Sequence, residues 1–162
     1  MGLLVASVAD DILEQLPQKL PEFKAGVDSH KYLKKQIVKG LKVKGKYNNK
    51  YLARCKQEFE VIAHHGFESY FLIVQDYVNW AKQQGIIVGP GRGSVCNCEI
   101  AYVLGITDVD SLYFDLDFTR FLRMDKKKLP DIDLDFETDR RQEVIEYIIR
   151  KYPGRAAQIS NY

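Results

Sequence analysis

The stretch PDIDLDF, residues 130–136, alternates acidic and apolar side chains behind a proline. Because successive side chains of a β-strand point to opposite faces, this alternation predicts a half-buried strand. Its two faces consist of Ile132, Leu134 and Phe136 on one side and Asp131, Asp133 and Asp135 on the other. Alternate residues lie about 6.5–7 Å apart, so neighbouring carboxylates can reach the same one or two divalent cations. Oxygen ligands favour Mg²⁺. A solvated strand face, with Arg140 and Arg141 as partners of the acids, is the alternative.

A glycine-rich turn, GPGRGS at residues 89–94, lies upstream, between a predicted buried strand at 86–88 and a predicted helix over 95–104. Three glycines in five residues let the backbone turn tightly and approach a ligand closely. The N–H groups at a helix start favour an anion, and Arg92 and Ser94 add further donors. No Gly-Lys-Ser/Thr follows at the spacing of a Walker A loop. The turn predicts phosphate binding, with a plain tight connection as the alternative.

The sequence around these two motifs reads mainly as helices, which predicts an α+β fold. Apolar residues recurring every three or four positions mark the helices, and glycines close them. The predicted helices cover residues 30–42 with Ser29 as N-cap, 50–65 ended by Gly66, 68–84 ended by Gly85, 95–104, and a last helix capped by Thr138 or Asp139. In the last helix the residues expected to face inward are Val144, Ile145, Ile148, Ile149 and Tyr152. Residues 1–28, with Pro17 and Pro21, read as a connector, residues 29–162 as one domain, and residues 106–129 as irregular, anchored by Phe118, Phe121 and Leu122.

The net charge of +2 over 162 residues conceals an uneven distribution. Residues 1–57 hold 12 basic and 5 acidic side chains, whereas residues 58–162 hold 12 and 17. Between Lys31 and Lys56 there are ten basic residues and no acid. Such a stripe can contact the phosphates of a nucleic acid, although a solvated helix face would have the same composition.

Composition also argues against several classes of protein. No apolar run approaches the ~18–20 residues of a membrane helix, and the N-terminus lacks the basic region of a secretory signal. Three cysteines, an odd number, argue against a disulfide framework and predict a reducing, cytoplasmic location. The run Lys126–Lys128 precedes the aspartates, and Arg120 lies between Phe118 and Phe121. These basic side chains could therefore reach a triphosphate.

Four motifs together resemble one family. They are ESYFLIVQDYVNWA at 68–81, GPGRGS at 89–94, FTRFL at 118–122 and PDIDLDF at 130–136. In this order and spacing they resemble the C-family replicative DNA polymerases of bacteria, the family of the DNA polymerase III alpha subunit. The resemblance extends over about residues 29–160.

The resemblance implies a partial palm of the polymerase-beta-like nucleotidyltransferase type with flanking helices. It implies that Asp131 and Asp133 bind two Mg²⁺ ions together with a third aspartate beyond Tyr162. The residues implied in binding the incoming triphosphate are Gly91, Arg92, Gly93, Ser94 and Arg120. A primer 3′-hydroxyl would attack the α-phosphate of a deoxynucleoside triphosphate. The implied partners are that nucleotide, primer–template DNA and, through regions outside this sequence, replisome subunits, with no membrane. Residues 1–28 would be the tail of a connection to a PHP domain.

On this interpretation the chain is a fragment of a DNA-directed DNA polymerase that cannot extend a primer alone. It departs from the family at VCNCE, residues 95–99, where small residues and another Gly-Ser are usual. Glu99 would oppose a triphosphate if it faced the loop. Two alternatives stay open. One is a small metal-dependent phosphohydrolase or nuclease that uses the same aspartates, and the other is a non-catalytic nucleic-acid-binding module built on Lys31–Lys56.

Overall fold

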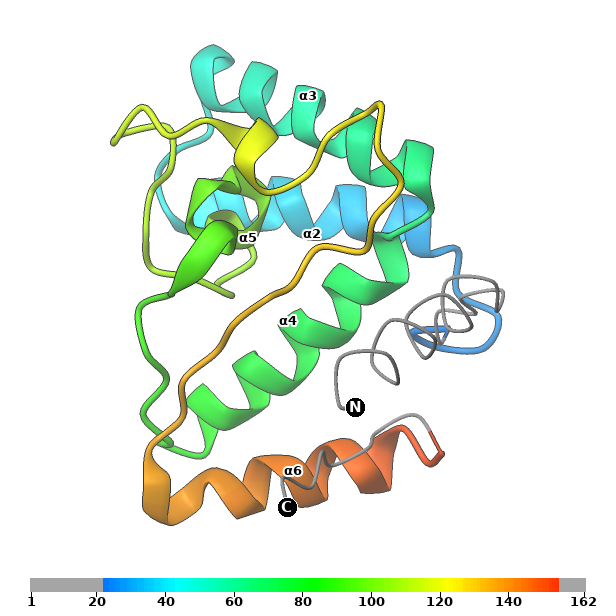
Figure 1. Cartoon of the computed structure of the whole chain (residues 1–162), viewed down its shortest axis with the longest axis vertical. Coiled ribbons are helices and arrows are strands. Elements are labelled where there is room, and N and C mark those ends of the chain that lie inside the picture. Colours follow the sequence, from blue (N-terminus) through cyan, green and yellow to red (C-terminus); the bar gives the residue numbers. More distant parts are fainter. Residues whose placement is uncertain (1–21, 155–162) are drawn as a thin grey trace, which may run out of the picture.

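The computed structural model describes residues 22–154, which form a largely helical body (Figure 1). The α-helices are α2 (Ser29–Val43), α3 (Asn49–His65), α4 (Glu68–Gln83), α5 (Glu99–Val103) and α6 (Arg141–Lys151), and the 3₁₀ turns are η1 (Gly93–Asn97), η2 (Phe118–Arg120) and η3 (Thr138–Arg140). In Figure 1, α4 runs down from the group of α2, α3 and α5, and α6 lies across its lower end. Within residues 22–154 no helix is long and apolar enough to cross a membrane.

One main core lies between α2, α3, α4 and α5. The predicted apolar stripes are confirmed except at Leu52, which is only partly buried. They bury Leu33, Ile37 and Leu41 from α2, Cys55, Phe59 and Ile62 from α3, and Phe71, Val74 and Val78 from α4. Burial of such side chains stabilises the folded state by about 1.5–3 kcal/mol each. Gly40 lets α2 approach α5 closely, because a Cβ there would lie 2.0 Å from the Val103 carbonyl oxygen.

The helix ends differ slightly from the predicted ones. The N-cap of α2 is Asp28, whose Oδ1 accepts a hydrogen bond from the Lys31 amide at 3.1 Å. The prediction of Ser29 was wrong by one residue, and the Ser29 hydroxyl instead forms a hydrogen bond with Ser69 at 2.9 Å. The end of α3 at Gly66, in the left-handed conformation with φ +74°, is confirmed. Of the predicted connector, residues 1–21 lie outside the described part of the chain, as do residues 155–162.

The single helix predicted over residues 95–104 is wrong. Residues 93–97 form η1, Cys98 is extended with φ −105° and ψ 113°, and α5 begins at Glu99. The start of α5 is fixed from α3, because the buried Glu58 carboxylate accepts hydrogen bonds from the Glu99 and Ile100 amides at 3.0 and 2.9 Å. Arg54 donates to the same carboxylate at 2.6 Å. Neither contact leaves a local signal in the sequence of 95–104.

The predicted strands are reduced to one point of contact, so only the helical part of the α+β prediction is confirmed. Val88 and Phe136 form an isolated antiparallel bridge, flanked by hydrogen bonds from the Gly89 amide to the Asp135 carbonyl and from the Glu137 amide to the Ile87 carbonyl, at 2.8 and 3.0 Å. Ile132, Leu134 and Phe136 are partly buried against the helical core. Packing on helices therefore accounts for the alternation that the sequence assigned to a sheet.

The last helix docks on α4 through a second, smaller apolar cluster. Its buried members are Ala81, Ile86 and Val144. The predicted caps Thr138 and Asp139 lie in η3, and α6 has no side-chain cap at its start. Of the predicted inward residues, Val144 and Tyr152 are buried, whereas Ile149 is 51% exposed, which contradicts the prediction. Ile148 packs on the cluster, and Ile149, the next residue around the helix, points to solvent.

Candidate functional site

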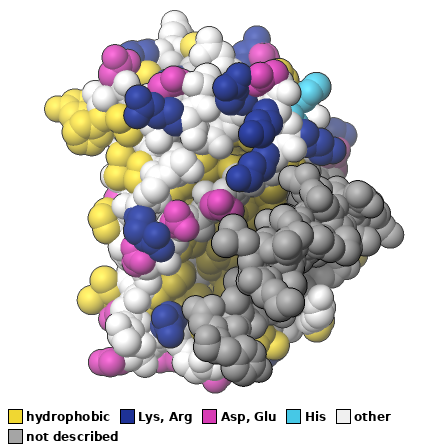
Figure 2. All heavy atoms as spheres, in the orientation of Figure 1, with side chains coloured by type: hydrophobic (Ala, Val, Ile, Leu, Met, Phe, Trp, Pro, Cys, Tyr) yellow, Lys and Arg dark blue, Asp and Glu magenta, His cyan; other side chains and the backbone are white. Residues whose placement is uncertain are grey.

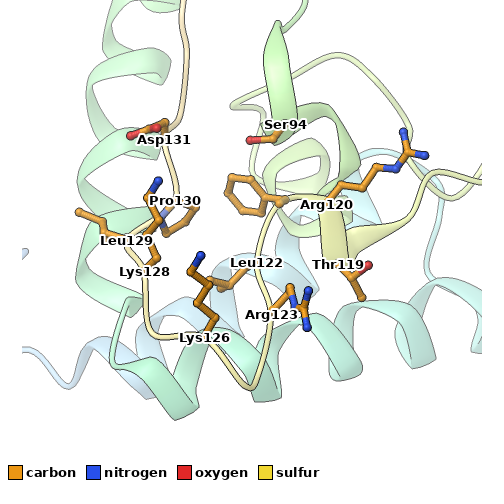
Figure 3. A pocket seen from close by; sticks show the side chains of 11 residues that line it. Ser94, Thr119, Arg120, Leu122, Arg123, Lys126, Lys128, Leu129, Pro130 and Asp131 are labelled. Atoms are coloured by element: carbon orange, nitrogen blue, oxygen red, sulfur yellow. The ribbon is translucent and has the colours of Figure 1, made fainter.

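A cavity of about 230 Å³ opens between η1, η2 and the segment that leads into the aspartates (Figure 3). Its lining residues are Ser94, Thr119, Arg120, Phe121, Leu122, Arg123, Lys126, Lys128, Leu129, Pro130 and Asp131. Four of these lining residues are cationic, whereas Asp131 is acidic. An excess of positive charge beside a hydroxyl group suits a ligand with several phosphates.

The cavity collects three of the predicted site residues from separate parts of the sequence. Ser94 comes from η1, Arg120 from η2 and Asp131 from the extended segment, and all three line the cavity. In Figure 3 the guanidinium of Arg120 extends away from Ser94 and Asp131. Lys126 and Lys128 also line it, in line with the suggestion from the basic run. Sequence reasoning missed Arg123. Arg123 lies three residues after Arg120. That spacing indicates a shared cavity only when the fold of the turn between the two residues is known.

The turn that carries Arg123 is held on both sides. The Arg123 guanidinium donates to the Asp125 carboxylate at 2.7 and 2.9 Å, and residues 123 and 126 form an isolated β-bridge. His65 donates from Nε2 to the Arg123 carbonyl at 2.7 Å. Of the three predicted anchors, Phe121 and Leu122 are buried and so confirmed, whereas Phe118 is only partly buried. The end of α3 therefore supports the cationic wall of the cavity.

The glycine-rich turn packs directly against the aspartate segment. A Cβ at Gly93, which has φ +71°, would lie 2.6 Å from Asp133 Oδ2, and a Cβ at Gly89 would lie 3.2 Å from Asp135 Cβ. Gly91, with φ +125°, abuts Thr107 and Cys96 instead. Neither Gly91 nor Gly93 lines the cavity. Gly89 and Gly93 therefore bring the backbone close to the protein's own carboxylates.

Arg92 contacts the aspartates as well. Its Nε lies 3.1 Å from Asp135 Oδ2, and its Nη1 lies 3.9 Å from Asp133 Oδ1. Arg92 does not line the cavity, and its side chain is 57% exposed. Arg92 therefore balances the charge of the second and third aspartates rather than that of the cavity.

Asp131 lines the cavity, and Asp133, two residues further along the segment, offers a second carboxylate outside it. Asp131 is exposed and the Asp133 side chain is 43% exposed, so both carboxylates are open to solvent. Carboxylate oxygens and the nearby Ser94 hydroxyl make a hard donor set, which fits Mg²⁺ rather than a thiophilic metal. Within residues 22–154 no group of three or more His, Cys, Asp or Glu side chains is placed to hold a metal ion.

Glu99 does not face the cavity, so it does not oppose a ligand there. It is fully buried, and its Oε2 accepts hydrogen bonds from the Ser111 hydroxyl and the Leu112 amide at 2.8 and 2.9 Å. Its Oε1 has no hydrogen-bond partner among the described residues. Burial raises the pKa of Glu99 above the usual glutamate value, against the opposing effect of these two hydrogen bonds.

The three cysteines have no role at the cavity. Cys55 and Cys98 are buried, and burial raises the pKa of both thiols well above the usual cysteine value. Cys98 accepts a hydrogen bond from the Ala101 amide at 3.4 Å and so caps α5. All three are free thiols.

Comparison with known proteins gives consistent matches. Residues 31–162 match the family model described as the bacterial DNA polymerase III alpha NTPase domain. The chain is 42% identical over 151 residues to DNA polymerase III subunit alpha of Staphylococcus aureus strain COL, which covers 92% of the chain and 14% of that relative. It is 42% identical over 160 residues to DNA polymerase III subunit alpha of Aquifex aeolicus strain VF5, with 94% and 14% covered. The chain thus spans about one seventh of the length of these relatives.

Proposed function

Because the chain belongs to the family of the bacterial DNA polymerase III alpha NTPase domain, we propose that it carries the triphosphate-binding part of a DNA-directed DNA polymerase. The substrate is a deoxynucleoside triphosphate, and the reaction is template-directed nucleotidyl transfer in DNA replication. The observation that carries this proposal is the cavity that Ser94, Arg120, Lys126, Lys128 and Asp131 line together. The fold proposed for this part is the beginning of a polymerase-beta-like palm.

In this proposal the residues of the chain bind and orient the nucleotide. Arg120, Lys126 and Lys128 neutralise the phosphate charges, and the Ser94 hydroxyl donates a hydrogen bond to a phosphate oxygen. Asp131 and Asp133 would hold Mg²⁺, which when bound neutralises charge that develops on the transferring phosphate. Arg92 pairs with Asp135 at 3.1 Å and lies 3.9 Å from Asp133, so a metal ion would have to compete with Arg92 for Asp133 but not for Asp131. Catalysis would then consist mainly of positioning and electrostatic stabilisation.

Four further features that the sequence and the family resemblance imply stay predictions. They are a third aspartate outside the 162 residues, contacts to primer–template DNA and replisome subunits, the connection of residues 1–28 to a PHP domain, and a cytoplasmic location. If the third carboxylate is supplied from outside, the chain by itself binds nucleotide without extending a primer. Direct contact of Arg92, Gly91 and Gly93 with a triphosphate also stays a prediction.

The test is binding of a fluorescent deoxynucleoside triphosphate with Mg²⁺ to the 162-residue chain. Loss of a charged hydrogen bond costs about 1.5–3 kcal/mol, so Arg120→Gln should weaken binding about 10- to 150-fold. Asp131→Asn should remove most of the dependence on Mg²⁺. Lys127→Gln is the control, because Lys127 belongs to the same basic run but does not line the cavity.

Two outcomes would overturn the proposal. One is nucleotide binding that is unchanged in Arg120→Gln, or reduced equally in Lys127→Gln. The other is steady release of phosphate from the nucleotide by the isolated chain, abolished in Asp131→Asn, which would favour the phosphohydrolase alternative.

A further inference from the structure

One side chain of α3 contacts both of the short elements that form the cavity. Arg54 Nη2 donates to the Asn97 carbonyl at 3.2 Å and to the Leu116 carbonyl at 2.8 Å. Asn97 is the last residue of η1, and Leu116 directly precedes Asp117, the N-cap of η2. Arg54 therefore ties the end of η1 to the start of η2 through a single nitrogen atom.

Both contacts lead within a few residues to the lining of the cavity. On η1, the Asn97 side chain donates to the Ser94 carbonyl at 3.0 Å. On η2, the Asp117 carboxylate accepts hydrogen bonds from the Thr119 amide and hydroxyl at 2.9 and 2.7 Å. Ser94 and Thr119 both line the cavity, whereas Arg54 does not. Arg54 thus reaches the cavity lining through these two hydrogen-bonded paths.

The orientation of Arg54 is fixed by a buried carboxylate. Its Nε donates to Glu58 Oε1 at 2.6 Å, and Glu58 is fully buried. The Arg54 side chain itself is 18% exposed. Because a guanidinium is planar, holding Nε on Glu58 also sets the direction in which Nη2 points. A lysine carries its three protons on one nitrogen, so it could not occupy the positions of Nε and Nη2 together.

The charge of Arg54 adds little to the attraction of a phosphate. It is offset by the Glu58 carboxylate, and Arg54 does not line the cavity. In Figure 2, Lys and Arg side chains gather on the upper right of the face shown, over the segment that leads from η2 into the aspartates in Figure 1. Any effect of Arg54 on a bound phosphate is therefore one of geometry.

We propose that Arg54 is a positioning residue for the nucleotide site, which sets the separation of η1 and η2 and hence the fit of the cavity to a triphosphate. This inference rests on the proposed function, because its ligand is the same deoxynucleoside triphosphate. A triphosphate contacts several lining groups at once, so its affinity depends on how far apart these groups are held. A monophosphate contacts fewer of them and is less sensitive to their separation.

The test compares the binding of a deoxynucleoside triphosphate and a deoxynucleoside monophosphate, both with Mg²⁺, to the unaltered 162-residue chain and to Arg54→Lys. Arg54→Lys keeps a positive charge beside the buried Glu58, but it has one donor nitrogen in place of two. The triphosphate should bind about tenfold more weakly, as for the loss of one charged hydrogen bond, and the monophosphate should bind as before. Asn97→Ala leaves Arg54 and Glu58 in place, removes the hydrogen bond to the Ser94 carbonyl and should show the same selective loss.

A double-mutant cycle separates positioning from a general loss of stability. If Arg54 acts through η1, Arg54→Lys should weaken triphosphate binding less in a Ser94→Ala chain than in the unaltered chain. Combined with Lys127→Gln the effects should add, because Lys127 does not line the cavity. Asp76→Ala is the control for stability, since it removes three hydrogen bonds between α4 and α6 and should leave the binding of both nucleotides unchanged.

Unchanged triphosphate binding in Arg54→Lys, while Arg120→Gln weakens it, would overturn this inference and leave the proposed function standing. Equal losses for the two nucleotides, or additive effects in the cycle with Ser94→Ala, would give Arg54 a structural role alone and overturn it as well. If the unaltered chain binds no triphosphate, the proposed function fails and this inference fails with it. Circular dichroism of each variant checks that the helices are intact.

Discussion

At the scale of single residues, Gly93 fixes how close the glycine-rich turn comes to Asp133. Gly93→Ala would place a Cβ 2.6 Å from Asp133 Oδ2 on a backbone with φ +71°, so it must displace the carboxylate. We expect the free energy of unfolding to fall by about 1–2 kcal/mol from the left-handed backbone alone, and Mg²⁺-dependent nucleotide binding to fall in addition. Chemical denaturation and nucleotide titration measure the two effects.

The matched control for this prediction is Gly85→Ala. Gly85 has φ +72°, but a Cβ there meets nothing within 4 Å. Gly85→Ala should lower the free energy of unfolding by the same backbone contribution and leave nucleotide binding unchanged. If both variants bound nucleotide equally, the close approach to Asp133 would have no functional weight.

Glu99 makes the stability of the protein depend on pH. Because burial raises its folded-state pKa above the unfolded value of about 4.3, the folded chain retains the proton after the unfolded chain has released it. Stability from this group is therefore complete below pH ~4.3 and falls as pH rises toward the raised pKa, by up to about 1.4 kcal/mol per pH unit. Glu99→Gln should make this decline shallower, and denaturation series at several pH values measure it. The buried Glu58, whose pKa burial also raises, accounts for the decline that remains. An unchanged decline in Glu99→Gln would contradict the role of Glu99.

At the scale of elements, one carboxylate of α4 adds three polar contacts to the apolar cluster that joins α4 and α6. Asp76 accepts hydrogen bonds from the hydroxyls of Tyr147 and Tyr152 at 3.0 and 2.9 Å, and from Lys151 Nζ at 2.7 Å. Hydrogen bonds to a charged group contribute about 1.5–3 kcal/mol each, so Asp76→Ala should loosen α6. Hydrogen exchange should speed up in α6 and remain unchanged in α2 and α3.

A surface ion pair serves as the control for α6. Arg140 and Glu143 bind each other at 2.9 Å near the start of the helix, at an exposed position. Exposed ion pairs contribute little, so Glu143→Gln should leave the exchange of α6 unchanged. If hydrogen exchange in α6 became equally faster in Asp76→Ala and Glu143→Gln, the contacts of Asp76 would have no special role in holding α6.

The long helices could be predicted from the sequence, and the short elements could not. Stripes such as Leu33, Ile37 and Leu41 carry enough periodicity to define α2 without any knowledge of its neighbours. The break at Cys98 depends on Glu58, about forty positions earlier, and the loss of the strand at 131–135 depends on helices that cover Ile132 and Leu134. Local patterns report burial, but they do not report what covers the buried face.

At the scale of the whole molecule, the same limit applies to the candidate site. The sequence motifs identified Ser94, Arg120 and Asp131, and the structure brings these three to one cavity. The motifs did not separate them from Arg92, which pairs with Asp135 instead. Membership of a cavity depends on where the 118–130 segment folds back, and this is set by buried anchors such as Phe121.

The contact between Glu58 and α5 also has a consequence for the order of folding. A five-residue helix is far too short to persist alone, and its capping carboxylate lies 41 and 42 residues earlier in the chain. Closing this loop costs conformational entropy, and α5 gains its cap only after the loop has closed. Arg54, also on α3, donates to the Leu116 carbonyl 62 residues away, and this contact closes a still longer loop on α3. We therefore expect the region around α5 to assemble late, on an α3 that has already formed.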